Sequence, residues 1–83
     1  NIDQGRLATF LKNSVGGHHA MGTCKMGLAS DPLAVVDQHG AVHGIKNLYI
    51  ADMSVVPVSV RWPNDTCYVI AEKIANDILV AYN

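Results

Sequence analysis

The order of hydrophobic and polar positions divides the chain into two helical ends and an irregular middle. Near the N-terminus, four apolar side chains recur near i, i+4 steps, which predicts a short amphipathic helix over residues 2–13. Asp3 lies in its first turn, where a carboxylate stabilises the helix dipole. Gly16 and Gly17 follow and predict a turn after the helix. The four apolar residues are Ile2, Leu7, Phe10 and Leu11.

The C-terminal helix has the clearest pattern. Apolar residues recur at i, i+3 and i+4 over residues 67–79, while Lys73 and Asp77 form an i, i+4 pair on the opposite face. Asn64 or Asp65 can cap the start of this helix. We therefore expect one continuous helix of about 17 residues at this end of the chain.

Between the helices, turn signals alternate with short apolar runs. Residues 33–36 and 41–42 predict short strands or irregular loops. Residues 47–52 have the composition of a buried strand that ends on a carboxylate. Pro57 removes the following run, residues 53–60, from the class of central strands, so an edge strand or a loop is expected there. Together these elements predict a fragment of a mixed α/β protein.

Composition indicates that the fragment belongs to something larger. The 83 residues are 49% hydrophobic and only 16% charged. A domain of this length buries only about 60% of the surface that its unfolded chain exposes, so much of the apolar content needs another surface to cover it. The opening residues lack the basic start and the apolar run of a signal peptide, so we expect a piece excised from a longer soluble protein. The sequence predicts no particular cellular compartment.

Charge and residue counts exclude several classes of partner. The net charge is −1 and the six basic residues are dispersed, which argues against nucleic acid. The apolar runs are far shorter than the roughly 20 residues that span a bilayer, so no membrane partner is expected. Two cysteines permit one disulfide, and four histidines without a C-x-x-C motif give no reason to expect a metal site. No glycine-rich phosphate-binding motif is present in these residues.

Several motifs in order carry a family resemblance. The runs HAMGTCKMG (residues 19–27), DPLAVVD (31–37) and VHGIKNLYIADMSVVP (42–57) resemble the C-terminal signature of the glucose-methanol-choline (GMC) oxidoreductases. Residues 69–75, VIAEKIA, are similar to the final helix of that family. The resemblance implies a Rossmann-like α/β (α+β) fold. Residues 1–47 would carry the substrate side with the active-site His motif, and residues 48–83 the last strand and the final helix of the FAD-binding domain.

The resemblance also implies a flavoenzyme and assigns roles to individual residues. The remainder of the same enzyme would bind FAD, with a plain or modified flavin, and a substrate C–H would give a hydride to flavin N5. His19 matches the histidine that faces the flavin, and the unperturbed pKa of histidine suits a proton acceptor at neutral pH. Asp52 and Met53, at the end of the predicted strand, are expected on the cofactor. The turn formed by Pro63, Asn64, Asp65 and Thr66 would place backbone amides under the flavin.

The chain departs from the family pattern just before that turn. Family members usually place a second His or Asn there, whereas this chain has Arg61 and Trp62, neither of which accepts a proton. A guanidinium can bind a carboxylate bidentately, so Arg61 and Trp62 are expected at the substrate, with His19 and Arg61 as the catalytic pair. Formate is the substrate in which one carbon is both carboxylate and hydride donor. In this respect the chain resembles a formate-oxidising member of the family, which has a His and Arg pair at the flavin.

The main expectation is therefore an FAD-dependent oxidase that converts formate and O2 to CO2 and hydrogen peroxide. An alcohol oxidase or dehydrogenase, with His19 as general base and Arg61 in a surface salt bridge, is the alternative within the same family. A small non-catalytic metal or interaction domain is the alternative from another class.

Overall fold

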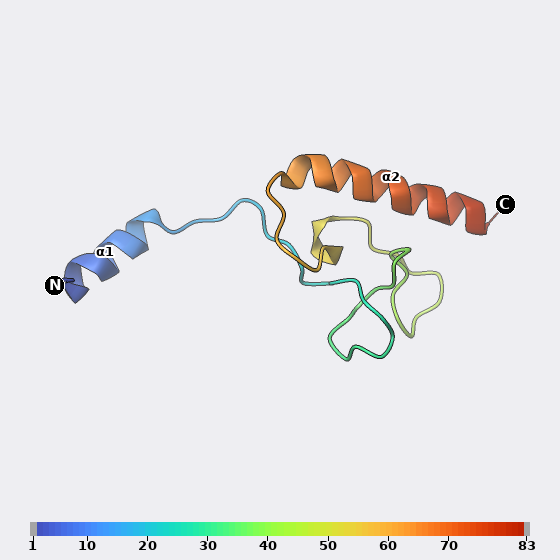
Figure 1. Ribbon diagram of the computed structural model, residues 1–83, viewed down its shortest axis with the longest axis horizontal. Coiled ribbons are helices and arrows are strands. Elements are labelled where there is room, and N and C mark those ends of the chain that lie inside the picture. The colour runs from blue at the N-terminus through green and yellow to red at the C-terminus, as the bar shows by residue number, and fades with distance from the viewer. Residues whose placement is uncertain (1, 83) are drawn as a thin grey trace.

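The computed structural model describes residues 2–82 and has an elongated shape (Figure 1). Its helical elements are α1 (Gln4–Ser14), the 3-10 helix η1 (Met53–Val55) and α2 (Pro63–Ala81). The molecule measures 62 × 28 × 16 Å. Its radius of gyration is 17.6 Å, whereas a compact chain of this length has about 12 Å. Neither α1 nor α2 is long and apolar enough to cross a membrane.

Helix α1 lies apart from the other elements, at the end of an extended segment (Figure 1). Its N-cap is Asp3, whose carboxylate accepts hydrogen bonds from the backbone N–H groups of Gly5 (3.0 Å) and Arg6 (3.2 Å). The predicted helix is confirmed, with Asp3 at the cap instead of in the first turn. None of its residues is buried, and Phe10 is 63% exposed. The apolar face of α1 therefore has nothing to pack against within residues 2–82.

A small core forms between α2 and the loops. The buried side chains are those of Val36, Val55, Val56 and Ile74, which come from a loop, from η1 and its end, and from α2. Gly40 is also buried, because its loop passes directly over Ile74. Residues from both sides of position 47/48 share this core. The division of the chain at that position, which concerns the whole enzyme, stays a prediction.

The strands expected in the middle of the chain do not form in residues 2–82. Pairing is reduced to three isolated bridges, which join Met26 to Val36, Val36 to Val42, and Ala41 to Tyr49. Turns follow each bridge within a few residues, so no ladder can lengthen. The prediction of a strand over residues 47–52 is therefore wrong for this structure. That segment pairs on one side only, with residues 40–42, and then turns into η1.

The run of residues 53–60 forms no strand; after η1 it continues as a loop, which confirms the loop predicted around Pro57. The predicted C-terminal helix is also confirmed, over 19 residues. Its predicted caps are wrong, because α2 begins at Pro63 and so takes Asn64 and Asp65 into its first turn. Proline is favoured at this position since its φ is already helical and its missing N–H would have no partner there.

Helix α2 is apolar on two faces. Ile74 is buried against the loop that contains Gly40, while the opposite side exposes three large apolar side chains. A helix that is apolar on most sides is normally buried on most sides. This second face accounts for part of the unusually apolar composition. Its residues are Tyr68, Val69 and Leu79.

Candidate active site

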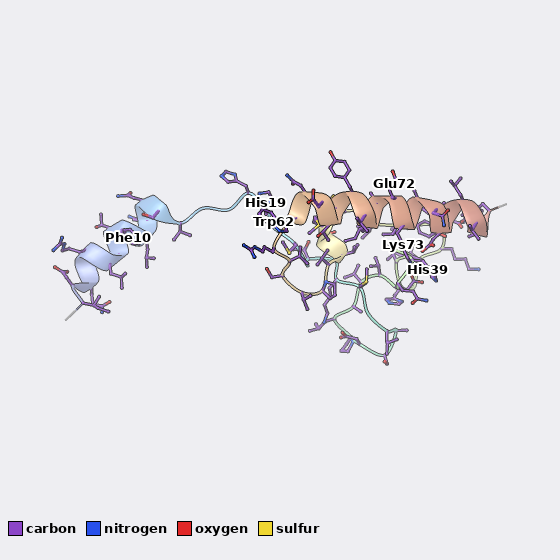
Figure 2. The ribbon with its side chains drawn as sticks, turned by 45° about the horizontal axis from the view of Figure 1, so that its top comes forward. Phe10, His19, His39, Trp62, Glu72 and Lys73 are labelled. Carbon is purple, nitrogen blue, oxygen red and sulfur yellow. The ribbon has the colours of Figure 1, made fainter. Side chains whose placement is uncertain are left out.

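One pocket of about 380 Å³ opens at the N-terminal end of α2. Figure 2 shows His19 beside Trp62 at this end of the helix, far from Phe10 on α1. Every residue that lines the pocket was predicted from the sequence as a site residue. They are His19, Arg61, Trp62, Pro63, Asn64 and Asp65.

His19 reaches the pocket because the segment after it is held along η1. The backbone N–H groups of Gly22, Cys24 and Met26 donate to the carbonyls of residues 53, 54 and 55 at 3.3, 2.8 and 2.9 Å. Gly22 has φ +88°, and a Cβ there would lie 3.2 Å from the Val56 carbonyl oxygen. Only glycine adopts this conformation without strain, which explains the glycine three residues after His19. His18, one residue before, is exposed and does not line the pocket.

Arg61 lies over the neighbouring aromatic ring. Its Cζ is 5.5 Å from the centroid of the Trp62 ring, within the range of a cation–π interaction. Among residues 2–82 no carboxylate lies within ion-pair distance of the Arg61 guanidinium. The surface salt bridge considered for this residue is therefore not formed within the part of the chain that the structure describes.

The N-terminus of α2 offers unpaired donors to the same pocket. Trp62 gives the helix no side-chain cap, and the backbone N–H groups of Asn64 and Asp65 donate to no acceptor within residues 2–82. The positive end of the helix dipole adds to these donors. The Asp65 carboxylate, which also lines the pocket, opposes an anion there. Arg61 and the two amides nevertheless give the pocket hydrogen-bond donors that suit ligand oxygens.

The remaining predicted site residues lie outside this pocket. Asp52 is the N-cap of η1, and its Oδ1 accepts hydrogen bonds from the Ser54 N–H (2.8 Å) and the Ser54 hydroxyl. These two bonds, the hydroxyl first, lower the pKa of Asp52 below its usual value, so this exposed carboxylate is charged. Met53 is half-buried and uses its carbonyl to accept from Gly22. Thr66 donates its hydroxyl to the Trp62 carbonyl at 2.9 Å.

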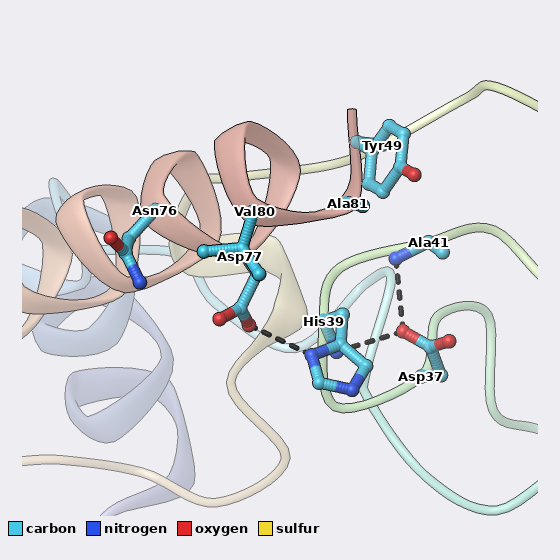
Figure 3. A pocket seen from close by; sticks show the side chains of 8 residues that line it. All are labelled: Asp37, His39, Ala41, Tyr49, Asn76, Asp77, Val80 and Ala81. Carbon is cyan, nitrogen blue, oxygen red and sulfur yellow. Dashed lines mark hydrogen bonds and ion pairs between the residues drawn. The ribbon is translucent and has the colours of Figure 1, made fainter. Parts of the chain in front are cut away.

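A polar cluster at the other end of α2 was only partly predicted. Lys73 and Asp77 do pair, as expected, but on the side of α2 that contacts the loops and not on the opposite face. His39 Nδ1 lies 2.8 Å from the Asp77 carboxylate (Figure 3). Lys73 also donates to the Gln38 carbonyl at 2.7 Å. The i, i+4 spacing revealed the pair on the helix, but no sequence signal linked it to a loop so far away in the chain. This cluster ties the loop of residues 37–41 to α2.

The two cysteines are free and half-buried, so the disulfide that the sequence permits is not formed. Residues 2–82 contain no group of three or more His, Cys, Asp or Glu side chains that could hold a metal ion.

Comparison with known proteins identifies the family. The sequence profile of the GMC oxidoreductases matches residues 2–71. The chain belongs to the GMC oxidoreductase family. Its similarity to individual members of that family is high over most of its length.

Three relatives illustrate the range of this GMC family. A glucose-methanol-choline family oxidoreductase of Annulohypoxylon moriforme is 50% identical over 62 residues, which are 72% of this chain and 10% of that protein. A 5-(hydroxymethyl)furfural oxidase of Methylovorus sp. is 43% identical over 93% of this chain and 15% of its own length. An oxygen-dependent choline dehydrogenase of Cronobacter sakazakii is 43% identical over 88% of this chain and 13% of its own length. The chain thus spans little more than a tenth of the relatives that it matches.

Membership of the GMC family implies FAD, and the residues present fit part of such a group. The unpaired amides of Asn64 and Asp65 suit the carbonyl edge of an isoalloxazine ring, since both are donors at a positive helix end. The charged Asp52 carboxylate keeps its second oxygen free of partners within residues 2–82, which suits sugar-like hydroxyls. The exposed apolar face of α2 fits a chain that forms one part of a larger GMC enzyme.

Proposed function

We propose that the enzyme to which these residues belong is a formate oxidase that depends on FAD. One observation carries the proposal: Arg61, without a carboxylate partner among residues 2–82, lines the same pocket as His19. An unpaired guanidinium beside a histidine suits a substrate that is an anion and whose oxidation needs no second base. Formate meets both conditions, because it is a carboxylate whose own carbon bears the hydride.

The overall reaction is HCOO⁻ + O2 + H⁺ → CO2 + H2O2. FAD supplies the acceptor for the hydride that leaves with the C–H bonding electrons, and dioxygen finally takes those two electrons. Every other task falls to side chains and backbone of the enzyme. No hydroxyl proton has to be removed from formate, so Arg61 can occupy a position where alcohol oxidation would need a base.

Arg61 binds the two formate oxygens with two parallel N–H donors, which fixes the direction of the C–H bond. His19 donates a hydrogen bond that orients the substrate and balances its charge. The Asn64 and Asp65 amides would hold a flavin carbonyl oxygen. Asp52 would accept hydrogen bonds from ribityl hydroxyls, with Met53 as its neighbour at the cofactor.

The second candidate is a GMC alcohol oxidase or dehydrogenase. The relatives named as a 5-(hydroxymethyl)furfural oxidase and a choline dehydrogenase favour it, because their names refer to alcohol substrates. In that case His19 accepts the hydroxyl proton. Arg61 then has a structural role, stacked on Trp62.

The test uses the full-length enzyme with FAD bound. Hydrogen peroxide release is measured with formate and with methanol and ethanol, for the wild type, Arg61→Lys and Arg61→Ala. We expect turnover of formate, with kcat/KM lowered by about 100-fold or more in Arg61→Ala because a charged contact to the substrate is lost. Arg61→Lys keeps the positive charge but not the two parallel N–H donors, so its kcat/KM should lie between those of the wild type and Arg61→Ala.

Each result has a distinct meaning. Unchanged formate turnover in Arg61→Ala would refute the role of Arg61. Oxidation of alcohols but not of formate by the wild type would favour the second candidate. A full-length protein without flavin absorbance would favour a non-catalytic domain.

A further inference from the structure

We propose that Trp62 is a positioning residue that holds the guanidinium of Arg61 in the pocket, where it can bind a substrate carboxylate. The inference rests on the proposed function, since it concerns how Arg61 is oriented for that task. Trp62 acts here through Arg61 and not through contact with the reacting atoms.

The backbone of Trp62 is fixed from both sides. Pro63 follows it and excludes the helical conformation, in agreement with its φ of −120° and ψ of 82°. Its carbonyl accepts two hydrogen bonds from Thr66, from the backbone N–H at 3.1 Å and from the hydroxyl at 2.9 Å. The start of α2 therefore sets the position from which the indole projects.

The ring in turn restricts Arg61. The guanidinium lies over the indole with its Cζ 5.5 Å from the ring centroid. A guanidinium over a ring interacts with it through its charge and keeps the N–H donors that point away from the ring available. Among residues 2–82 no carboxylate competes for those donors. A long side chain that would otherwise sample many rotamers is thus held with its fork free.

Location supports the same role. Arg61 and Trp62 both line the pocket that contains His19. Without the indole, Arg61 could turn toward the Asp65 carboxylate in the same pocket, and its charge would be lost to the substrate. The stacked ring thus favours binding of an anion by Arg61 over an internal ion pair.

The experiment compares Trp62→Leu and Trp62→Phe in the full-length, FAD-loaded enzyme. Binding of acetate, a carboxylate that has no hydride to give at the carboxyl carbon, is measured by calorimetry, and KM and kcat are measured with formate. A cation–π contact of the usual strength predicts a Kd for acetate and a KM for formate raised about 2- to 30-fold in Trp62→Leu. The phenyl ring of Trp62→Phe should restore most of the affinity, and kcat should change less than KM.

A double-mutant cycle isolates the coupling to Arg61. In an Arg61→Gln background, Trp62→Leu should weaken acetate binding no further, because the group that Trp62 holds is gone. Equal losses in both backgrounds, or no rescue by phenylalanine, would overturn the positioning role. Trp62→Met replaces Trp62→Leu if the latter fails to retain flavin.

The two proposals fail differently. If Arg61→Gln itself leaves the acetate Kd and the formate KM unchanged, the proposed function fails. If Arg61→Gln raises the acetate Kd and the formate KM but Trp62→Leu raises neither constant, only the role of Trp62 fails.

Discussion

Gly40 lies against Ile74 of α2 so closely that a Cβ on the glycine would be 2.9 Å from the Ile74 Cδ1 atom. The same Cβ would lie 2.7 Å from the Ile50 carbonyl oxygen. Gly40 also has φ +77°, a conformation that other residues rarely adopt. Loop and helix meet here at a distance that only a glycine permits.

Gly40→Ala should therefore destabilise the full-length enzyme, by about 1–3 kcal/mol from overpacking with backbone strain in addition. The midpoint of chemical unfolding measures the effect. Gly16→Ala is the matched control, because a Cβ at Gly16 meets nothing within 4 Å and its φ is not positive. Equal midpoints for Gly40→Ala and Gly16→Ala would contradict the close packing.

Gly22→Ala should lower kcat strongly while the unfolding midpoint changes little. The new methyl group would press on the Val56 carbonyl and strain the turn that leads to His19. A displacement of about 1 Å at a catalytic group can cost about 100-fold in rate. Steady-state kinetics on the FAD-loaded enzyme test this, with Gly17→Ala as control because its Cβ would also meet open space. An unchanged kcat in Gly22→Ala would show that the turn does not position His19.

Replacement of His19 should affect the chemical step. We expect His19→Asn to lower kcat by about 10²- to 10⁴-fold, as is typical for loss of a group that handles a proton or charge in the transition state. His18→Asn is the control, because His18 is exposed and outside the pocket. Comparable losses in both variants would mean that the pair matters for folding and not for catalysis.

The contact of Asp77 with Lys73 and His39 should make stability depend on pH. The Lys73 ammonium, and then His39, lower the pKa of Asp77 below its usual value. A lowered pKa in the folded state stabilises the protein at pH values above the ordinary aspartate pKa of about 3.9, and this stabilisation is lost as the pH falls through the lowered value.

Asp77→Asn should thus lower the melting temperature of the full-length enzyme at neutral pH, and the difference from wild type should shrink below about pH 4. Glu72→Gln is the control, since Glu72 is an exposed carboxylate on α2 without a hydrogen-bond or ion-pair partner among residues 2–82. A difference that persists unchanged at low pH would exclude the ionic origin.

The isolated 83-residue chain should neither retain FAD nor oxidise formate or alcohols. Four buried hydrophobic residues make a very small core, and α1 has no partner within residues 2–82. The flavin content of the purified chain, by absorbance, checks the prediction against the full-length enzyme. Tight flavin binding by the isolated chain would contradict it.

Periodicity was sufficient to predict both helices, because a 3.6-residue apolar repeat is visible within a few turns. It failed for residues 47–52, since apolar composition alone does not provide the neighbouring strands that a sheet requires. The caps of α2 were missed because Pro63 sets the start of the helix against the preference of Asn64 and Asp65.

The candidate site followed from motif order and not from periodicity. That His19 and Arg61 meet in one pocket depends on the pairing of residues 22–26 with η1, which no local pattern encodes. The link of His39 to Asp77 was missed for the same reason. Contacts between distant segments depend on the packing of the whole chain, whereas the roles expected of single residues rest on the family resemblance and stay predictions.

Helix α2 is fixed to the loops at Ile74, its buried residue. With a rise of about 1.5 Å per residue, Trp62 lies about 18 Å along the helix from Ile74. A tilt of the helix by about 5° at Ile74 would therefore shift Trp62 by about 1.5 Å. The contacts of Lys73 and Asp77 with residues 38 and 39 lie on either side of Ile74 and resist such a tilt. The position of Trp62 at the pocket therefore depends in part on polar contacts in the C-terminal half of the helix.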